Sequence, residues 1–213
     1  MARSPRPFVD GMSQHVVQRG NNRSRMFADC GDFTVFLITL RDACRCYGVK
    51  VHGYVLMTTH FHLLVTPVAK NSLPLMMQQV GRRYVPYFNR RHRRTGGLWE
   101  GRYHPHLVPT EQYWFRCLRY IELNPVRAGM VATPDGYTWS SYGTHAHGEP
   151  NPLIELHPLY LALGDTPSAR QAAYRALCGV PLTEAELAAI RYAVQTGVVE
   201  SDEATPMSVV PAS

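Results

Sequence analysis

Two absences limit what this chain can be. Long apolar runs are missing, because none approaches the ~18 consecutive apolar residues that a membrane-spanning helix needs. The first residues, MARSPRPFVDGMSQ, include arginines but no apolar stretch, so we expect no secretory signal. We therefore predict a soluble, cytoplasmic protein without a membrane partner.

Paired cysteines are missing as well. The five cysteines form an odd set without any CxxC spacing, which argues against a disulfide scaffold or a zinc ribbon. We expect reduced and mostly buried thiols. An apolar fraction of 45% excludes a disordered chain, and 213 residues suit one domain with appendages.

Lysine is nearly absent, since only Lys50 and Lys70 stand among the 22 basic residues that give the chain its net charge of +6. The planar guanidinium of arginine binds phosphate and guanine edges through paired hydrogen bonds. Arginines crowd one short segment, and a localised basic stripe favours a nucleic acid as partner. This arginine stripe consists of Arg82, Arg83, Arg90, Arg91, Arg93 and Arg94.

Hydrophobic periodicity predicts an α+β fold. The order βαββαβ is that of the ferredoxin-like unit, an antiparallel sheet with helices on one face. Pro86 should kink or break the second helix, and Pro105 confines the last strand to an edge or a bulge. Strands are predicted at 15–19, 50–57, 60–66 and 102–108, and helices at 32–47 and, capped by Asn71 or Ser72, up to residue 94.

The chain changes character after residue 124. A third helix is expected at 111–123, followed by a stretch rich in proline and glycine and by two helices at 167–178 and 183–195. We expect a C-terminal helical appendage to the sheet domain. The predicted division is an N-terminal extension 1–13, a central domain 14–131, a mostly helical region 132–198 and a disordered tail 199–213.

His60 and His62 form the candidate metal site. Side chains alternate along a strand, so the two imidazoles lie on one face while Phe61 enters the core on the other. Such a pair can bind one divalent ion and leave positions open for substrate oxygens. The alternative is two surface histidines on a half-exposed strand.

Two further HxH pairs weaken this argument. The pair His104 and His106 brackets Pro105, and we interpret it as an edge-strand or DNA-facing pair. The pair His145 and His147 lies where no rigid geometry is predicted. A structural zinc site that joins the three pairs is the alternative, but only the pair at 60 and 62 has a firm strand beneath it.

Tyr120 is the candidate nucleophile. Trp114, Leu118 and Ile121 form the buried stripe of the helix at 111–123, and at about 100° per residue Tyr120 falls on its flank with Arg116. A tyrosine beside a cation and near a metal can attack phosphorus. The alternative is a half-buried packing residue.

Asn124 has two possible roles that the sequence leaves open. Its amide oxygen lies one turn beyond Tyr120 and can complete a metal shell. Asn124 and Pro125 also form a good N-cap and first-turn proline for a short helix.

Five segments together resemble the REP-associated tyrosine transposases, a branch of the single-tyrosine HUH transposase family. They occur in family-like order and cover most of residues 14–145. The segments are HVVQRGNNR (15–23), GYVLMTTHFHLLVTP (53–67), LWEGRYH (98–104), YIELNPVRAGMV (120–131) and WSSY (139–142).

The resemblance implies a ferredoxin-like catalytic domain that cleaves single-stranded DNA at REP-type palindromic hairpins. His60 and His62 match the histidines that bind Mg²⁺ or Mn²⁺, and Tyr120 matches the nucleophile that forms a 5′-phosphotyrosine and frees a 3′-hydroxyl. Asn124 matches the polar residue four positions later, which is commonly glutamine in related insertion-sequence transposases. That difference leaves its ligand role open.

Single-stranded or hairpin DNA is therefore the expected partner, bound by basic residues along the backbone and by aromatic stacking. The run from Arg19 to Asn22 either contacts bases or fixes a tight loop. The competing interpretation is a regulatory protein, derived from a transposase, that binds DNA without cleaving it. The sequence permits a monomer or a homodimer. Besides the arginine stripe, the DNA-binding candidates are Arg19, Asn21, Asn22, Trp99, Arg102, Tyr103 and Arg116.

Overall fold

The computed structural model describes residues 8–199 and contains one four-stranded sheet in that range. Its strands are β1 (Gln14–Arg19), β2 (Val49–Met57), β3 (His60–Pro67) and β4 (His104–Leu107). They lie in the order β2-β3-β1-β4, and every neighbouring pair is antiparallel. With one helix after β1 and another after β3, this is the predicted ferredoxin-like fold, which is confirmed.

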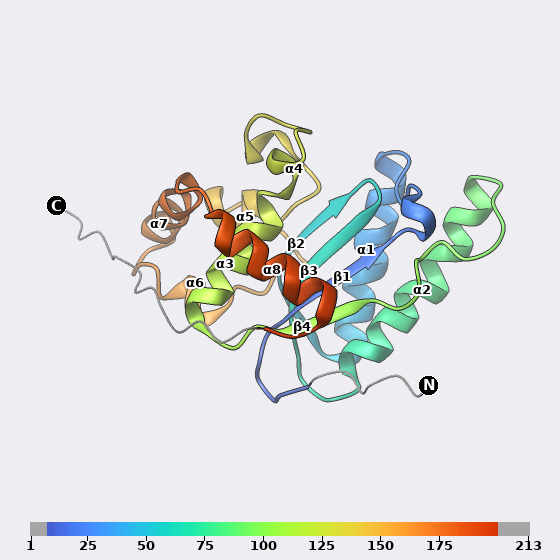
Figure 1. Ribbon diagram of the computed structural model, residues 1–213, viewed down its shortest axis with the longest axis horizontal. Coiled ribbons are helices and arrows are strands. Elements are labelled where there is room, and N and C mark those ends of the chain that lie inside the picture. The colour runs from blue at the N-terminus through green and yellow to red at the C-terminus, as the bar shows by residue number, and fades with distance from the viewer. Residues whose placement is uncertain (1–7, 200–213) are drawn as a thin grey trace.

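Two long helices, α1 (Cys30–Tyr47) and α2 (Ser72–Arg91), cover one face of the sheet (Figure 1). Their apolar faces and the strand residues that point toward them, such as Val16 and Phe61, form one core cluster. Helix α1 begins earlier than predicted because the Asp29 carboxylate accepts hydrogen bonds from two backbone N–H groups of the first turn. Helix α2 continues through Pro86.

Helix α2 ends at Arg91, three residues before the predicted end. His92 follows as the C-cap, and its Nε2 lies 2.9 Å from a carboxylate oxygen of buried Asp32 in α1. Arg93 has a φ of 50°, in the left-handed region that a helix cannot use. The contact between His92 and α1 therefore ends the helix before Arg93 and Arg94, the last two residues of the arginine stripe.

Further helices cover the opposite face of the sheet, as Figure 1 shows for α3 and α8. Helix α3 (Glu111–Glu122) packs against β2 and β3, and α8 (Glu184–Thr196) packs against β4 and β1. The predicted helical appendage thus forms a second layer over the sheet. The remaining elements are α4 (Asn124–Arg127), α5 (Tyr142–His147), α6 (Pro158–Leu161), α7 (Pro167–Gly179) and the 3₁₀ turns η1 (Asn21–Arg23) and η2 (Pro134–Gly136).

A buried carboxylate holds the C-terminal layer in place. Glu122, at the end of α3, accepts hydrogen bonds from Ser141, from His145 at 2.8 Å and from the hydroxyl of Tyr174 at 2.5 Å. Ser141 also accepts a hydrogen bond from the backbone N–H of Tyr54 in β2. This network fixes α3, α5 and α7 to one strand, although the boundary proposed at residue 131 stays a prediction. The tail predicted at 199–213 lies, apart from residue 199, outside the described residues.

Candidate active site

The two candidate histidines lie on the face of the sheet that α3 and α8 cover. Phe61 between them is buried in the core against α1 and α2, as strand alternation predicts. The rings of His60 and His62 lie with their centroids 5.1 Å apart. His62 is buried with 4% exposure, whereas His60 at the start of β3 is half-buried.

Each of these histidines uses Nδ1 for a hydrogen bond. Nδ1 of His62 lies 2.8 Å from Nε2 of His15, and Nδ1 of His60 lies 3.2 Å from the hydroxyl of Thr59. Within residues 8–199, Nε2 of either ring has no hydrogen-bond partner. Two imidazole nitrogens on one face are thus left for a shared ligand.

The histidines of this face are held in the neutral form. Burial, with a smaller contribution from the nearby charge of Arg19, lowers the pKa of His60 to about 4. Burial also lowers the pKa of His62 well below its usual value, and the neighbouring His60 adds to this effect. A neutral imidazole offers the lone pair that a metal ion needs, so both side chains are ready to ligate near neutral pH.

Tyr120 lies beside them. Its ring centroid is 5.8 Å from that of His62 and 6.0 Å from that of His15, and the side chain is half-buried. The guanidinium of Arg127, from α4, lies over the phenol ring with its central carbon 4.3 Å from the centroid. A tyrosine, two free imidazole nitrogens and a cation therefore meet on one face of one chain.

The structure tests one of the two local roles considered for Asn124, that of an N-cap. The N-cap of α4 is Leu123, and Asn124 is the first residue of that helix. Neither residue caps the helix through its side chain, so the N-cap prediction for Asn124 is wrong. The reason is that α3 and α4 are nearly continuous, since the N–H of Leu123 bonds to Arg119 and that of Arg127 bonds to Leu123. The Asn124 amide has no hydrogen-bond partner among residues 8–199.

A cavity of about 410 Å³ adjoins the histidines on the side of α8. Val17, which is the cross-strand partner of His62, contributes to its floor. Two arginines, one glutamate and two polar side chains are among the residues around it. The lining residues are Val17, Arg19, Arg23, Glu100, His104, Val194 and Gln195.

The predicted arginine stripe is exposed, but acids of α1 bind part of it. Arg91 forms an ion pair with Asp29 at 2.8 Å, and Arg83 lies 3.9 Å from Asp42. Arg94, which is partly buried, lies 5.8 Å from the ring of Phe88. Arg82, Arg90 and Arg93 have no acidic partner in the described range, so these three leave positive charge at the surface.

The loops beside His60 carry further DNA-binding candidates. The backbone N–H of Gly20 bonds to Thr59 at 2.8 Å, which joins the end of β1 to the turn before His60. Arg19, Asn21, Asn22 and Arg102 are exposed near this junction. Asn22 has a φ of 51°, so the run also fixes a tight loop, and both functions considered for it remain compatible with its position.

The side chains of three other candidates contact neighbouring residues of the protein. Trp99 lies against Gly81 of α2, where an added Cβ would be 2.9 Å from its ring, and Tyr103 is only 7% exposed. The buried ring of Tyr103 offers no free face for stacking on a base, whereas Trp99 is half-buried and its predicted contact with DNA stays a prediction. Arg116 forms an ion pair with Glu186 of α8 at 2.8 Å.

In each of the two remaining HxH pairs, the two histidines contact different residues. His106 is fully buried, 4.7 Å from the ring of His15, whereas His104 is exposed on the rim of the cavity. Both residues belong to β4, the edge strand of the sheet, so the edge-strand interpretation is confirmed, whereas the buried side chain of His106 cannot face DNA. His145 is buried against Glu122, and His147 lies 2.5 Å from Asp135 at the surface. The three pairs do not meet at one metal site.

Sequence reasoning missed three residues of the site: His15, His106 and Arg127. Strand alternation could have found the first, because His15 lies one residue from core residue Val16, as His62 lies one residue from Phe61. The cation over Tyr120 comes seven residues later, which is two helical turns, but a change of helix lies between them. The helical period could not be applied to this pair because the sequence did not show that α3 and α4 are nearly continuous.

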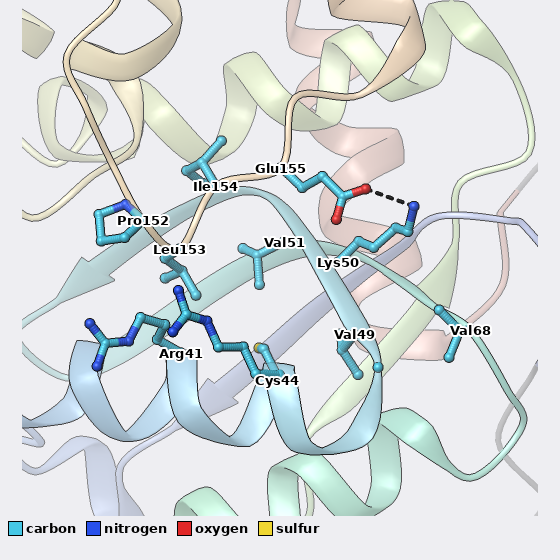
Figure 2. Close-up of a pocket in the computed structure, with 12 residues that line it drawn as sticks. Arg41, Cys44, Val49, Lys50, Val51, Val68, Pro152, Leu153, Ile154 and Glu155 are labelled. Carbon is cyan, nitrogen blue, oxygen red and sulfur yellow. Dashed lines mark ion pairs between the residues drawn. The ribbon is translucent and has the colours of Figure 1, made fainter.

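A second cavity, of about 420 Å³, lies at the other end of the β2–β3 hairpin (Figure 2). Val49 and Lys50 contribute to it from the start of β2, whereas His60 pairs with Met57 at the end of that strand. Lys50 is neutralised by Glu155 at 2.7 Å, as the dashed line in Figure 2 marks. This cavity does not belong to the histidine site.

The comparison with family models identifies the class of protein. Residues 8–124 match the family described as "Transposase IS200 like", which is more than half of the chain. The protein therefore belongs to the IS200-like transposase family and is a DNA-binding transposase, as the five segments quoted from the sequence predicted. No curated protein matches the sequence. Among the described residues, no helix combines the length and apolarity that crossing a membrane requires.

One solved structure agrees with the fold over most of the chain. The structure of a REP-associated tyrosine transposase bound to a REP hairpin superimposes with a TM-score of 0.56 at 15% identity, over 74% of this chain and 93% of that one. A transposase candidate from Deinococcus radiodurans R1 gives 0.40 at 20% identity, over 52% of this chain and 89% of that one. The first similarity extends the family assignment to the three-dimensional fold of most of the chain.

Proposed function

We propose that this transposase is a metal-dependent endonuclease and strand transferase that cleaves single-stranded DNA at REP-like hairpins. The observation that carries the proposal is the position of Tyr120, whose ring lies 5.8 Å from His62 on the face where His60 and His62 leave Nε2 free. A nucleophile and two metal-binding nitrogens are the parts that phosphoryl transfer requires.

His60, His62 and Asn124 are the residues that would hold Mg²⁺ or Mn²⁺. The neutral imidazoles and the amide oxygen without a partner fit such an ion, which keeps open positions for substrate oxygens. A bound divalent ion would polarise the scissile phosphate and offset the negative charge that grows in the transition state.

Tyr120 performs the cleavage in this proposal. Its phenolic oxygen attacks the phosphorus, the bond from phosphorus to the 3′ oxygen breaks, and the leaving strand takes up a proton as a free 3′-hydroxyl. The strand on the other side stays bound as a 5′-phosphotyrosine. Attack by another 3′-hydroxyl reverses the reaction, frees the phenol and joins two strands.

The exposed cations support a DNA hairpin as substrate. Arg82, Arg90 and Arg93 on one side and Arg19 with Arg23 beside His60 can bind phosphates of a folded strand. The fold shared with a transposase that was solved with a REP hairpin supports the same substrate class.

The test is adduct formation with single-stranded hairpin oligonucleotides, assembled from palindromes of the source genome, in the presence of Mn²⁺ or Mg²⁺. Wild-type protein should form a complex that survives denaturing electrophoresis, and Tyr120→Phe should form none while its binding affinity stays within about twofold. Tyr137→Phe is a matched control, because the Tyr137 hydroxyl donates to the Leu56 backbone carbonyl and bonds to neither histidine.

Two results would contradict the proposal. An adduct with Tyr120→Phe would show that another residue is the nucleophile. Tight hairpin binding by the wild type without cleavage, with either ion and across many hairpins, would favour a regulatory protein that binds DNA only.

A further inference from the structure

His15 and His62 form a buried pair that the proposed chemistry does not use directly. They come from neighbouring antiparallel strands, and Nε2 of His15 lies 2.8 Å from Nδ1 of His62. Both side chains are buried, with 0% and 4% exposure. One proton must lie between the two nitrogens, because two lone pairs at this distance would repel each other.

The position of that proton determines whether His62 can bind a metal. A neutral imidazole carries one N–H and one lone pair. If His62 donates from Nδ1, its Nε2 keeps the lone pair and is a ligand. If His15 donates from Nε2 instead, Nδ1 of His62 accepts, and Nε2 of His62 carries the hydrogen and cannot bind a metal.

We propose that His15 is a positioning residue that accepts the Nδ1–H of His62 and thereby presents Nε2 of His62 to the catalytic metal ion. This inference rests on the proposed function. Metal-binding histidines commonly donate their second N–H to a fixed acceptor, which sets both the ring orientation and the tautomer. Here a second imidazole takes the place of the more usual carboxylate or carbonyl.

The orientation of the His15 ring supports a contact dedicated to His62, whichever nitrogen of His15 carries the hydrogen. Nδ1 of His15 is buried and has no hydrogen-bond partner within residues 8–199, although buried polar atoms are usually paired. The ring is therefore held in an orientation that serves Nε2 at the expense of Nδ1. The only hydrogen bond this side chain makes in that range is the one to His62.

The same geometry bears on a second arrangement of ligands. The ligating atoms of His15, His106 and Cys117 all lie within 4.8 Å of one another, and all three residues are buried. A zinc ion bound there through Nδ1 of His15 would leave the hydrogen on Nε2, so His62 would have to accept it. That tautomer of His62 is the one that cannot bind the catalytic ion, and the two metal sites are mutually exclusive in this hydrogen-bonded geometry.

The expected effect is a loss of metal affinity. Removing such an acceptor typically weakens metal binding by about 10- to 100-fold. His15→Phe keeps a ring of similar size and removes the acceptor, whereas His15→Gln keeps an oxygen that can accept from Nδ1–H. We expect His15→Phe to weaken Mn²⁺ binding by about 10- to 100-fold and His15→Gln to restore it to within about threefold of the wild type.

The experiment measures Mn²⁺ binding by electron paramagnetic resonance, on full-length protein without DNA. His52→Gln is the matched control, because His52 is also buried in the sheet but bonds to Thr66 and to the Glu155 carbonyl. Circular dichroism and thermal unfolding verify that each variant is folded. A second measurement needs no variant: ¹⁵N NMR of the apo wild type should find the His62 hydrogen on Nδ1.

The outcomes separate this inference from the proposed function. If the wild-type protein binds no Mn²⁺, or if its Mn²⁺ binding persists in His62→Ala, both the proposed function and the role of His15 are overturned. Wild-type binding that His15→Phe leaves unchanged, or a His62 hydrogen found on Nε2, would overturn the role of His15 alone. The role of His15 would also be overturned if the protein holds stoichiometric zinc, which Cys117→Ser releases, while Mn²⁺ still binds at His62.

Discussion

At the scale of single residues, the contact between Arg127 and Tyr120 has the most direct consequence for chemistry. A guanidinium that lies over a phenol ring fixes the ring and places positive charge 4.3 Å from its centroid. A partly desolvated contact of this type contributes about 1 to 2 kcal/mol. We therefore propose that Arg127 assists the reaction of Tyr120, although the motif at 120–131 that contains it did not mark it as a candidate.

We predict that Arg127→Ala lowers the rate of adduct formation roughly tenfold, because about 1.4 kcal/mol corresponds to one factor of ten in rate. Single-turnover assays at saturating DNA measure this rate independently of affinity. Arg45→Ala, which removes an exposed arginine of α1, is the control and should leave the rate unchanged. An Arg127→Ala variant with the wild-type rate would show that the stacked cation does not assist the reaction.

The sequence predicted His60, His62 and Tyr120 because each depends on a local period. Two residues per repeat place both imidazoles on one side of a strand, and 3.6 residues per turn place Tyr120 on the flank of a buried helical stripe. The contacts of His15 with His62 cross two strands that lie 47 positions apart in sequence. Register between strands is a property of the sheet, and neither strand contains it alone.

At the scale of elements, the distance between α3 and the sheet sets where Tyr120 lies. A Cβ at Gly53 of β2 would come within 2.4 Å of Leu118 Cδ1, so the helix packs directly on the strand backbone at this point. Glu122 fixes the end of the same helix through Ser141 and His145. The helix that carries Tyr120 is therefore held at two places.

We predict that Gly53→Ala destabilises the protein by about 1 to 3 kcal/mol, because the added methyl group overpacks this contact. Adduct formation should fall as well if the buried Leu118 side chain cannot rotate away, because α3 would then move from the sheet and carry Tyr120 with it. Chemical denaturation and the adduct assay measure the two effects. Gly179→Ala is the matched control: nothing lies within 4 Å of a Cβ at that position, so the same substitution should be tolerated.

Helix ends and helix contacts also show where prediction from the sequence fails. The six elements of the ferredoxin-like unit were predictable because each has its own hydrophobic period and its own turn residues. The early end of α2 was not, because the contact between His92 and Asp32 joins residues 60 positions apart. The continuity of α3 and α4 across Pro125 was missed because proline is tolerated in the first turn of a helix.

At the scale of the whole molecule, buried neutral histidines make stability depend on pH. Burial lowers the pKa of His52 and of His106 to about 4, and it also lowers the pKa of His15. In the unfolded chain these groups return to about 6.5. Between the two values the unfolded chain binds more protons, so the free energy of unfolding falls as pH decreases from about 6.5 to 4 and levels off below that.

We predict that His52→Gln reduces this loss. For one such histidine the loss amounts to roughly 3 kcal/mol when pH 4 is reached. The measurement is urea unfolding at several pH values, with His104→Gln at the exposed edge as the control for the substitution itself. A wild-type stability that stays constant between pH 7 and pH 4 would contradict the account of buried neutral imidazoles.

Tyr120 lies next to the histidines of its own chain. This arrangement determines whether one protein molecule needs a second one to form the adduct. If each chain carries both halves of its catalytic centre, the rate of adduct formation per molecule should not change on dilution. A mixture of Tyr120→Phe and His62→Ala proteins should remain inactive, because neither can lend its intact half to the other. Activity recovered on mixing would instead reveal an exchange of the tyrosine helix between two chains.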